Sequence, residues 1–173
     1  NGESIDLTKD PMWDAVGNKA KFMSDETRPR FNFGYSETHF AGGEKPGELG
    51  GLFFRGDCRY PEKRAYYGAK TEMLTLSKPL RASGKVAFKR GVSDSTTLFG
   101  FFHAEHSVHV HDSQKTGMPS DFVGFAIEGP SAQGFYAYPC YRVHDGDSSS
   151  GYPENIPRIY PDGAPHTWKL TID

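Results

Sequence analysis

Glycine and proline recur so often along this chain that long helices are disfavoured. The 173 residues include 20 glycines and 12 prolines, and both residue types weaken or break helices. No long stretch carries apolar residues at the i, i+3, i+4 spacing of an amphipathic helix, whereas short β-type runs lie between the turns. The pattern predicts an all-β fold, with strands at residues 30–35, 49–55, 64–70, 72–76, 85–90, 97–103, 122–128, 134–138 and 166–172.

The clearest strand pattern lies at residues 166–172, where Trp168, Leu170 and Ile172 alternate with polar residues. One face of this strand should therefore be buried and the other exposed. Turn residues predict two hairpins: residues 91–96 would join strands 85–90 and 97–103, and residues 129–133 would join strands 122–128 and 134–138. We expect long loops at residues 36–48, 105–120 and 143–164, and such loops on a β scaffold often carry function.

The charge and hydropathy of the chain narrow its partners. Lys and Arg total 20 against 22 Asp and Glu, a formal net charge of −2, whereas a nucleic-acid-binding domain needs a basic surplus. No apolar run approaches the ~20 residues that a membrane span requires. We therefore expect that the chain binds no nucleic acid and does not span a membrane. Its length favours one domain over residues 1–173. We also expect one or more further strands beyond residue 173.

The two cysteines, Cys58 and Cys140, are separated by 81 residues and belong to no CxxC motif. A zinc-ribbon or thioredoxin-type site is therefore disfavoured. A disulfide between them would close a long loop and stabilise the fold by roughly 4 kcal/mol in the chain-entropy model. Two unpaired thiols are the equal alternative.

Six short segments, taken in order, resemble the concanavalin A-like lectin/glucanase superfamily, and its little-characterised secreted bacterial members above all. They are WDAVGN (13–18), NFGYS (32–36), AGG with GELGG (41–43 and 47–51), AYY (65–67), LFGFF (98–102) and HTWKLT (166–171). The resemblance implies an antiparallel β-sandwich, a jelly roll of two curved sheets with a concave face. It also implies an extracellular or periplasmic protein that binds or cleaves a polysaccharide or oligosaccharide.

Cleavage would need positioned acid and base groups. The E-x-D-x-x-E motif of the superfamily's glucanases is absent, which disfavours a retaining hydrolase of that kind. The order Arg55, His103, then Tyr136 and Tyr138 resembles that of alginate-lyase-like sandwiches, although their longer signatures are not matched. The resemblance implies β-elimination with His103 as base, Tyr138 or Tyr136 as acid, and Arg55 facing substrate charge. The alternative is that both tyrosines are ordinary sheet residues.

Sugar binding alone asks for aromatic faces and planar polar groups. The chain offers several tyrosines and Trp13 as aromatic faces. Trp168 and five phenylalanines (Phe53, Phe99, Phe101, Phe125 and Phe135) are assigned to the core instead. The residues predicted to contact substrate are Asn32, Tyr66, Glu105, Tyr141 and Arg142.

Residues 103–112 hold four histidines and two acids, a composition that suits a transition metal. An extended chain would place His103, Glu105, His109 and His111 on one face and His106 on the other. A second segment with Asp145 and Asp147 supplies oxygen ligands for Ca²⁺, although an ordinary Asp/Gly/Ser turn is the plainer and favoured explanation. The predicted metal ligands are His109, His111, Asp145 and Asp147.

Three functional interpretations follow. The first is a carbohydrate-active module that binds or cleaves polysaccharide on a concave sheet face. The second is a non-catalytic, lectin-like binding module. The third is a structural or adhesive domain whose partners are other chains of a larger extracellular assembly, for which an exposed apolar patch facing another chain would be diagnostic.

Overall fold

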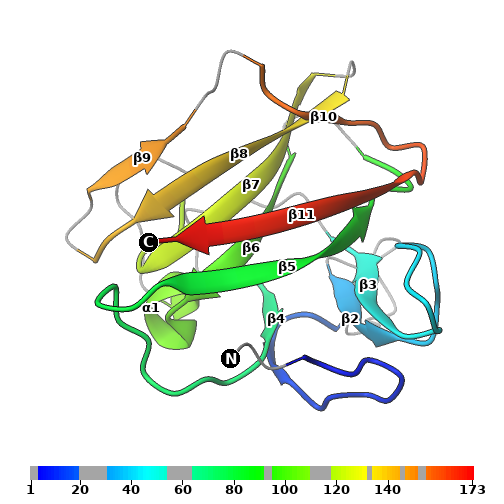
Figure 1. The fold of residues 1–173 in the computed structure, drawn as a ribbon, viewed down its shortest axis with the longest axis horizontal. Helices are drawn as coiled ribbons and strands as arrows, with labels where there is room; N and C mark the ends of the chain where they lie inside the picture. Colours follow the sequence, from blue (N-terminus) through cyan, green and yellow to red (C-terminus); the bar gives the residue numbers. More distant parts are fainter. Residues whose placement is uncertain are drawn as a thin grey trace, which may run out of the picture. The chain divides into compact units, whose positions relative to one another are not determined.

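The computed structural model describes residues 4–19, 31–53, 64–91, 95–109, 118–131, 134–144, 147–151 and 155–173. These residues form antiparallel strands and one short helix (Figure 1), so the all-β prediction is confirmed. The chain divides into two compact units. Unit 1 comprises Asn1–Phe54, Tyr66–Ala87 and Gly163–Asp173, and unit 2 comprises Arg55–Ala65 and Phe88–Asp162. The interpretation of residues 1–173 as one domain stays a prediction.

Unit 2 is built on a five-stranded antiparallel sheet. Its strands are β6 (Ser95–Phe102), β7 (Phe122–Ser131), β8 (Gly134–Arg142), β9 (Ser148–Ser150) and β10 (Arg158–Ile159). The order is β10-β8-β7-β6, and β9 also pairs with β8. Helix α1 (Ala104–His109) follows β6. The predicted hairpin between β7 and β8 is confirmed.

The core of unit 2 lies on one face of β7 and β8, because alternate residues of a strand share a face. The buried cluster consists of Met118, Phe122, Ala126, Tyr138 and Cys140. On the opposite face of β7, Ile127 is fully buried, and the rings of Phe99 and Phe125 stack at 5.2 Å across the β6–β7 pair. Strand β7 is thus covered on both faces, which suits its central place in the sheet.

The described residues of unit 1 form three two-stranded ladders: β1 (Asp14–Val16) with β4 (Tyr66–Gly68), β2 (Asn32–Ser36) with β3 (Glu48–Leu52), and β5 (Leu80–Ala87) with β11 (Pro165–Ile172). Figure 1 shows β5 in green beside β11 in red. The alternation predicted for residues 166–172 is confirmed, since Leu170 is buried and its neighbours Lys169 and Thr171 are exposed. Trp168 lies opposite Gly84, where an added Cβ would be 3.2 Å from the indole.

Several predicted elements are wrong. Residues 72–76 form no strand, and the strand expected at 85–90 runs from Leu80 to Ala87. In the described part of the chain, β5 pairs with β11 and β6 pairs with β7, and the predicted pairing of the strands on either side of residues 91–96 is not found. Strands β5 and β11 have eight residues each, and Leu80 and Val86 of β5 are buried. The apolar faces of the two strands match over their full length, so β5 pairs with β11 and not with the strand that follows it in the sequence.

The predicted loops also hold regular structure. The segment 105–120 begins inside helix α1, whose first turn carries Glu105, an acidic residue that suits a helix start. The segment 143–164 contains β9 and β10. Of the phenylalanines assigned to the core, Phe135 is buried, whereas Phe53 is 48% exposed and stacks on Phe33. Among the described residues, no helix has the length and apolar character needed to cross a membrane.

The loop between β2 and β3, predicted at residues 36–48, is confirmed and is organised by the Glu48 carboxylate. This carboxylate accepts hydrogen bonds from the Thr38 hydroxyl and from the backbone N–H groups of Phe40 and Ala41, the latter two at 3.0 and 2.8 Å. Partial burial alone would raise the pKa of Glu48, but these hydrogen bonds outweigh it and lower the pKa below 4.5.

Stability should therefore depend on pH through Glu48. A carboxyl group whose pKa is lower in the folded state stabilises the fold above its unfolded pKa, and this contribution is lost as pH falls through the folded pKa. We expect Glu48→Gln to cost about 1 kcal/mol at pH 7, a figure reduced for solvent screening, and to flatten the fall in stability below pH 5. Urea unfolding from pH 7 to pH 3 measures this, with exposed Glu37→Gln as the control. A wild-type slope in Glu48→Gln would contradict it.

Candidate functional site

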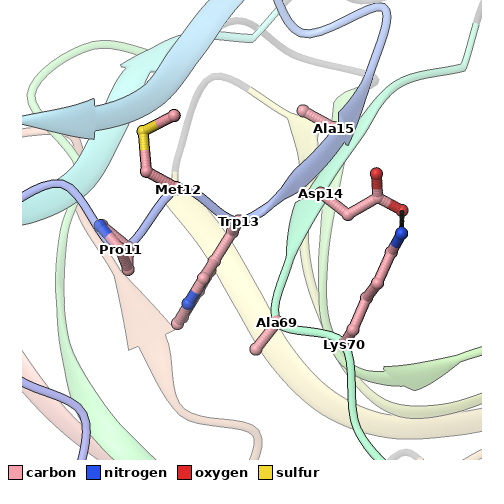
Figure 2. A pocket seen from close by; sticks show the side chains of 7 residues that line it. All are labelled: Pro11, Met12, Trp13, Asp14, Ala15, Ala69 and Lys70. Carbon is pink, nitrogen blue, oxygen red and sulfur yellow. Dashed lines mark ion pairs between the residues drawn. The ribbon is translucent and has the colours of Figure 1, made fainter.

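A pocket of about 560 Å³ lies in unit 1, beside the β1–β4 ladder. Figure 2 shows its lining: Pro11, Met12, Trp13, Asp14, Ala15, Ala69 and Lys70. The half-buried Trp13 indole supplies an aromatic wall, and the Asp14 carboxylate and the Lys70 ammonium group supply charges of opposite sign. The volume is within the range of about 300–1,000 Å³ that is usual for small-molecule sites.

The chain that carries Trp13 is shaped by Asp10. The Asp10 carboxylate accepts hydrogen bonds from the backbone N–H of Met12 at 2.8 Å and from the Tyr67 hydroxyl at 3.2 Å. Met12 has a φ of 52°, a left-handed conformation that ordinary residues seldom adopt. The turn directs Trp13 toward β4. The centroids of the Trp13 and Tyr67 rings lie 5.6 Å apart, and the ring planes are tilted by 33°.

The far end of β1 is also anchored. The Asn18 side-chain amide donates to the Phe33 carbonyl at 2.6 Å, and the Phe33 N–H donates to the Asn18 carbonyl at 2.7 Å. Asn18 is buried, so these bonds are protected from water and hold the segment that follows β1 against β2. Both ends of the pocket-bearing segment are thereby fixed.

The polar side of the pocket is built around Asp14. Tyr66 donates its hydroxyl to Asp14 Oδ2 at 2.9 Å. Lys70 Nζ lies 3.7 Å from the same oxygen, and Figure 2 shows this ion pair. Burial, then the hydrogen bond and charge of Asp14, raise the pKa of Tyr66. The phenol therefore stays protonated at neutral pH and keeps donating. Burial likewise raises the pKa of Tyr67.

A second cluster lies in unit 2, where His106, Asp121 and His144 bring their ligand atoms within 4.8 Å of one another. His106 Nδ1 lies 2.6 Å and His144 Nδ1 lies 3.1 Å from Asp121 Oδ2. The His103 ring stacks on His106 at 4.0 Å. The segment that begins at Ala104 is helical and not extended, so the opposite placement of His103 and His106 that an extended chain would give does not apply.

Of the residues predicted for β-elimination, the three that the structure describes, His103, Tyr136 and Tyr138, do not come together. Phe102, next to His103, aligns with Phe122 and through it with Arg142. Tyr138 and Tyr136 lie four and six residues before Arg142 on β8, about 13 and 20 Å along the strand. Tyr138 is buried in the core and donates its hydroxyl to Glu128.

Tyr136 and Arg55, which also belong to the predicted β-elimination set, give that prediction no further support. The Tyr136 ring is half-buried, and the Arg158 guanidinium lies 5.3 Å from its centroid. Arg55 lies outside the described residues.

The residues predicted to contact substrate are divided between the two units. Tyr66 lies beside the Trp13 pocket, as described above. Asn32 and Glu105 are exposed on β2 and α1, and Tyr141 is 43% exposed on β8. Arg142 is buried in unit 2, where it donates to the Met118 carbonyl at 2.8 Å. Its guanidinium therefore serves the interior of the unit, which gives its predicted contact with substrate no support.

The predicted metal ligands and disulfide are tested only in part. His111 and Asp145 lie outside the described residues, as does the side chain of His109 in α1. Asp147 is exposed, and its backbone carbonyl accepts from Val143 N–H.

Of the predicted disulfide pair, Cys140 is a buried free cysteine, whereas Cys58 lies outside the described residues. Burial raises the pKa of the Cys140 thiol to about 12. The thiol is therefore protonated and unreactive at neutral pH.

Four of the residues that form these two clusters were missed in the sequence: Asp14, Lys70, Asp121 and His144. Asp121 and His144 become visible once the strand register is known. They lie one residue before Phe122 and two residues after Arg142, which are paired residues of neighbouring strands. The chain matches no protein-family model, no curated protein and no solved structure.

Proposed function

We propose that this chain is a carbohydrate-binding β domain and that the Trp13 pocket receives a sugar residue of its ligand. One observation carries the proposal: the half-buried Trp13 indole, the Asp14 carboxylate and the Lys70 ammonium group line one pocket whose volume suits a small ligand. A pyranose ring presents apolar C–H groups on one face and hydroxyls around its edge. An aromatic wall suits the first, and a carboxylate and an ammonium group suit the second.

The charges of the pocket favour a neutral or weakly charged saccharide. Asp14 and Lys70 carry opposite charges, and their side chains are 34% and 80% exposed. An ion pair this exposed contributes little to stability. Lys70 is therefore free energetically to turn toward ligand hydroxyls as a donor, and Asp14 can accept from them where it stands. Tyr66 keeps the Asp14 carboxylate oriented while this happens.

The proposal is for binding rather than cleavage. His103 and the two tyrosines lie far apart along the sheet, which gives an elimination step with this set no support. The concanavalin A-like jelly roll and an extracellular or periplasmic location belong to the same proposal. They rest on the sequence resemblance and agree with the antiparallel all-β architecture.

We expect Trp13→Ala to weaken saccharide binding about 10- to 100-fold, since the aromatic wall is lost while the ladder beneath it stays. Affinity gel electrophoresis against neutral glucan, xylan and galactomannan, with alginate and pectin as acidic comparisons, measures the loss. Phe40→Ala removes an exposed aromatic ring elsewhere in unit 1 and should leave the retardation unchanged.

Three results would contradict the proposal. Wild-type mobility unaffected by every polysaccharide would argue for the structural or adhesive alternative. Loss of binding in Tyr141→Ala but not in Trp13→Ala would place the sugar in unit 2. Release of unsaturated or reducing-end products would mean that the chain is an enzyme.

A further inference from the structure

We propose that His106, His144 and Asp121 form a binding site for one divalent transition-metal ion such as Zn²⁺. Both imidazoles turn Nδ1 toward the same carboxylate oxygen, at 2.6 and 3.1 Å. Zinc bonds of 2.0–2.1 Å in tetrahedral geometry separate neighbouring ligand atoms by about 3.3 Å. An ion can therefore replace the two hydrogen bonds with ligand shifts of less than about 1 Å.

Strand register explains why these three residues meet. His106 lies in the helix that follows β6, Asp121 immediately precedes β7, and His144 lies in the turn that follows β8. Phe102, Phe122 and Arg142 are paired across these strands. The three segments therefore leave the same end of one sheet, and a rigid scaffold sets the spacing of the ligands.

The Asp121 carboxylate is held in place by its backbone. Asp121 has a φ of 52°, a conformation that aspartate tolerates better than most residues. Its carbonyl accepts the His103 N–H at 3.1 Å and the Ser107 hydroxyl at 3.3 Å. The buried Ser107 hydroxyl also donates to the Ser120 carbonyl at 2.6 Å. Helix α1 thus carries one ligand and fixes the backbone of another.

Outer contacts orient the two histidines. The His103 ring stacks on His106 at 4.0 Å with a 21° tilt and limits rotation of the ligand ring. The Val143 N–H donates to the Asp147 carbonyl at 2.9 Å, which closes the turn that bears His144. Contacts of this kind around the ligands tune metal affinity in known sites.

The donor set selects the ion. Two imidazole nitrogens and one carboxylate oxygen suit Zn²⁺, Cu²⁺ or Ni²⁺, whereas Ca²⁺ and Mg²⁺ prefer oxygen ligands alone. The side chains of His106, Asp121 and His144 are 38%, 25% and 65% exposed, so an ion can enter from solvent. Three protein ligands leave a coordination position for water or another small ligand.

The test is calorimetric titration of the chelator-treated full chain with Zn²⁺. We expect one ion per chain and an affinity at least about 100-fold weaker in His144→Ala, since loss of an outer contact alone costs 10- to 100-fold. His144 is 65% exposed, so this variant should fold, and circular dichroism of the variant is the check. His166→Gln in β11 is the matched control and should bind as the wild type does. Equimolar Ca²⁺ should not displace the zinc.

Long-range ¹H–¹⁵N spectra of the wild type give a second, variant-free readout. We expect zinc to shift Nδ1 of both His106 and His144. A double variant, His109→Ala with His111→Ala, should keep its affinity. Zinc binding that disappears in this double variant but survives in His144→Ala would assign the ion to the histidine tract and overturn the proposal. Absence of zinc binding by the wild type, or displacement by Ca²⁺, would overturn it as well.

Discussion

Gly51→Ala is expected to destabilise the fold by about 3–5 kcal/mol, a loss large enough to unfold a marginal domain. Gly51 has a φ of 132°, which L-residues rarely adopt, and a Cβ there would lie 2.1 Å from the Asn32 carbonyl oxygen and 2.7 Å from the Phe33 Cα. Both contacts are with backbone of the paired strand β2, which cannot move aside without breaking the ladder. Urea unfolding measures the change.

Gly50 provides the matched control for this experiment. It is the preceding residue of the same strand, and a Cβ there would meet nothing within 4 Å. Gly50→Ala should change the free energy of unfolding by less than about 1 kcal/mol, since alanine only reduces the freedom of the unfolded chain. Equal losses in the two variants would show that the backbone of β2 does not approach Gly51 as described.

Arg142→Ala is expected to cost about 2–4 kcal/mol of stability. The side chain is 5% exposed and donates to the Met118 carbonyl at 2.8 Å. Alanine leaves that buried carbonyl without this donor and removes the packing of the long side chain. Arg81→Ala, on an exposed position of β5, should change stability by no more than about 0.5 kcal/mol.

The same variant separates a structural role from a binding role for Arg142. At a temperature where it remains folded, Arg142→Ala should bind polysaccharide with wild-type affinity. A variant of wild-type stability that has lost binding would return Arg142 to the substrate contacts predicted from the sequence.

Local sequence patterns predicted the parts of the fold that depend on local interactions. The alternation of apolar and polar residues in β11 and the turn between β7 and β8 are readable within a dozen residues. The pairing of β5 with β11 joins residues about 85 positions apart, a separation that local pattern cannot reveal. Helix α1 was missed because its six residues are too few to display helical periodicity.

In the candidate sites, too, local sequence patterns pointed to some of the residues but not to their long-range partners. Trp13 was recognised as an available aromatic face, but Lys70, which lines the same pocket, lies beyond β4 and reaches it only because β1 pairs with β4. The histidine-rich tract drew attention to metal binding, yet Asp121 and His144 come from segments that only the register of β7 and β8 places beside His106. Residue types could be predicted, whereas their grouping required the fold.

The most direct measurement of the sugar-binding proposal uses the pocket's own fluorophore. The chain has two tryptophans, so Trp168→Phe leaves Trp13 as the single reporter. Titration with an oligosaccharide of the bound polysaccharide should shift Trp13 emission and saturate at the midpoint found by calorimetry. Calorimetric binding that leaves the emission of Trp13 unchanged would contradict the account.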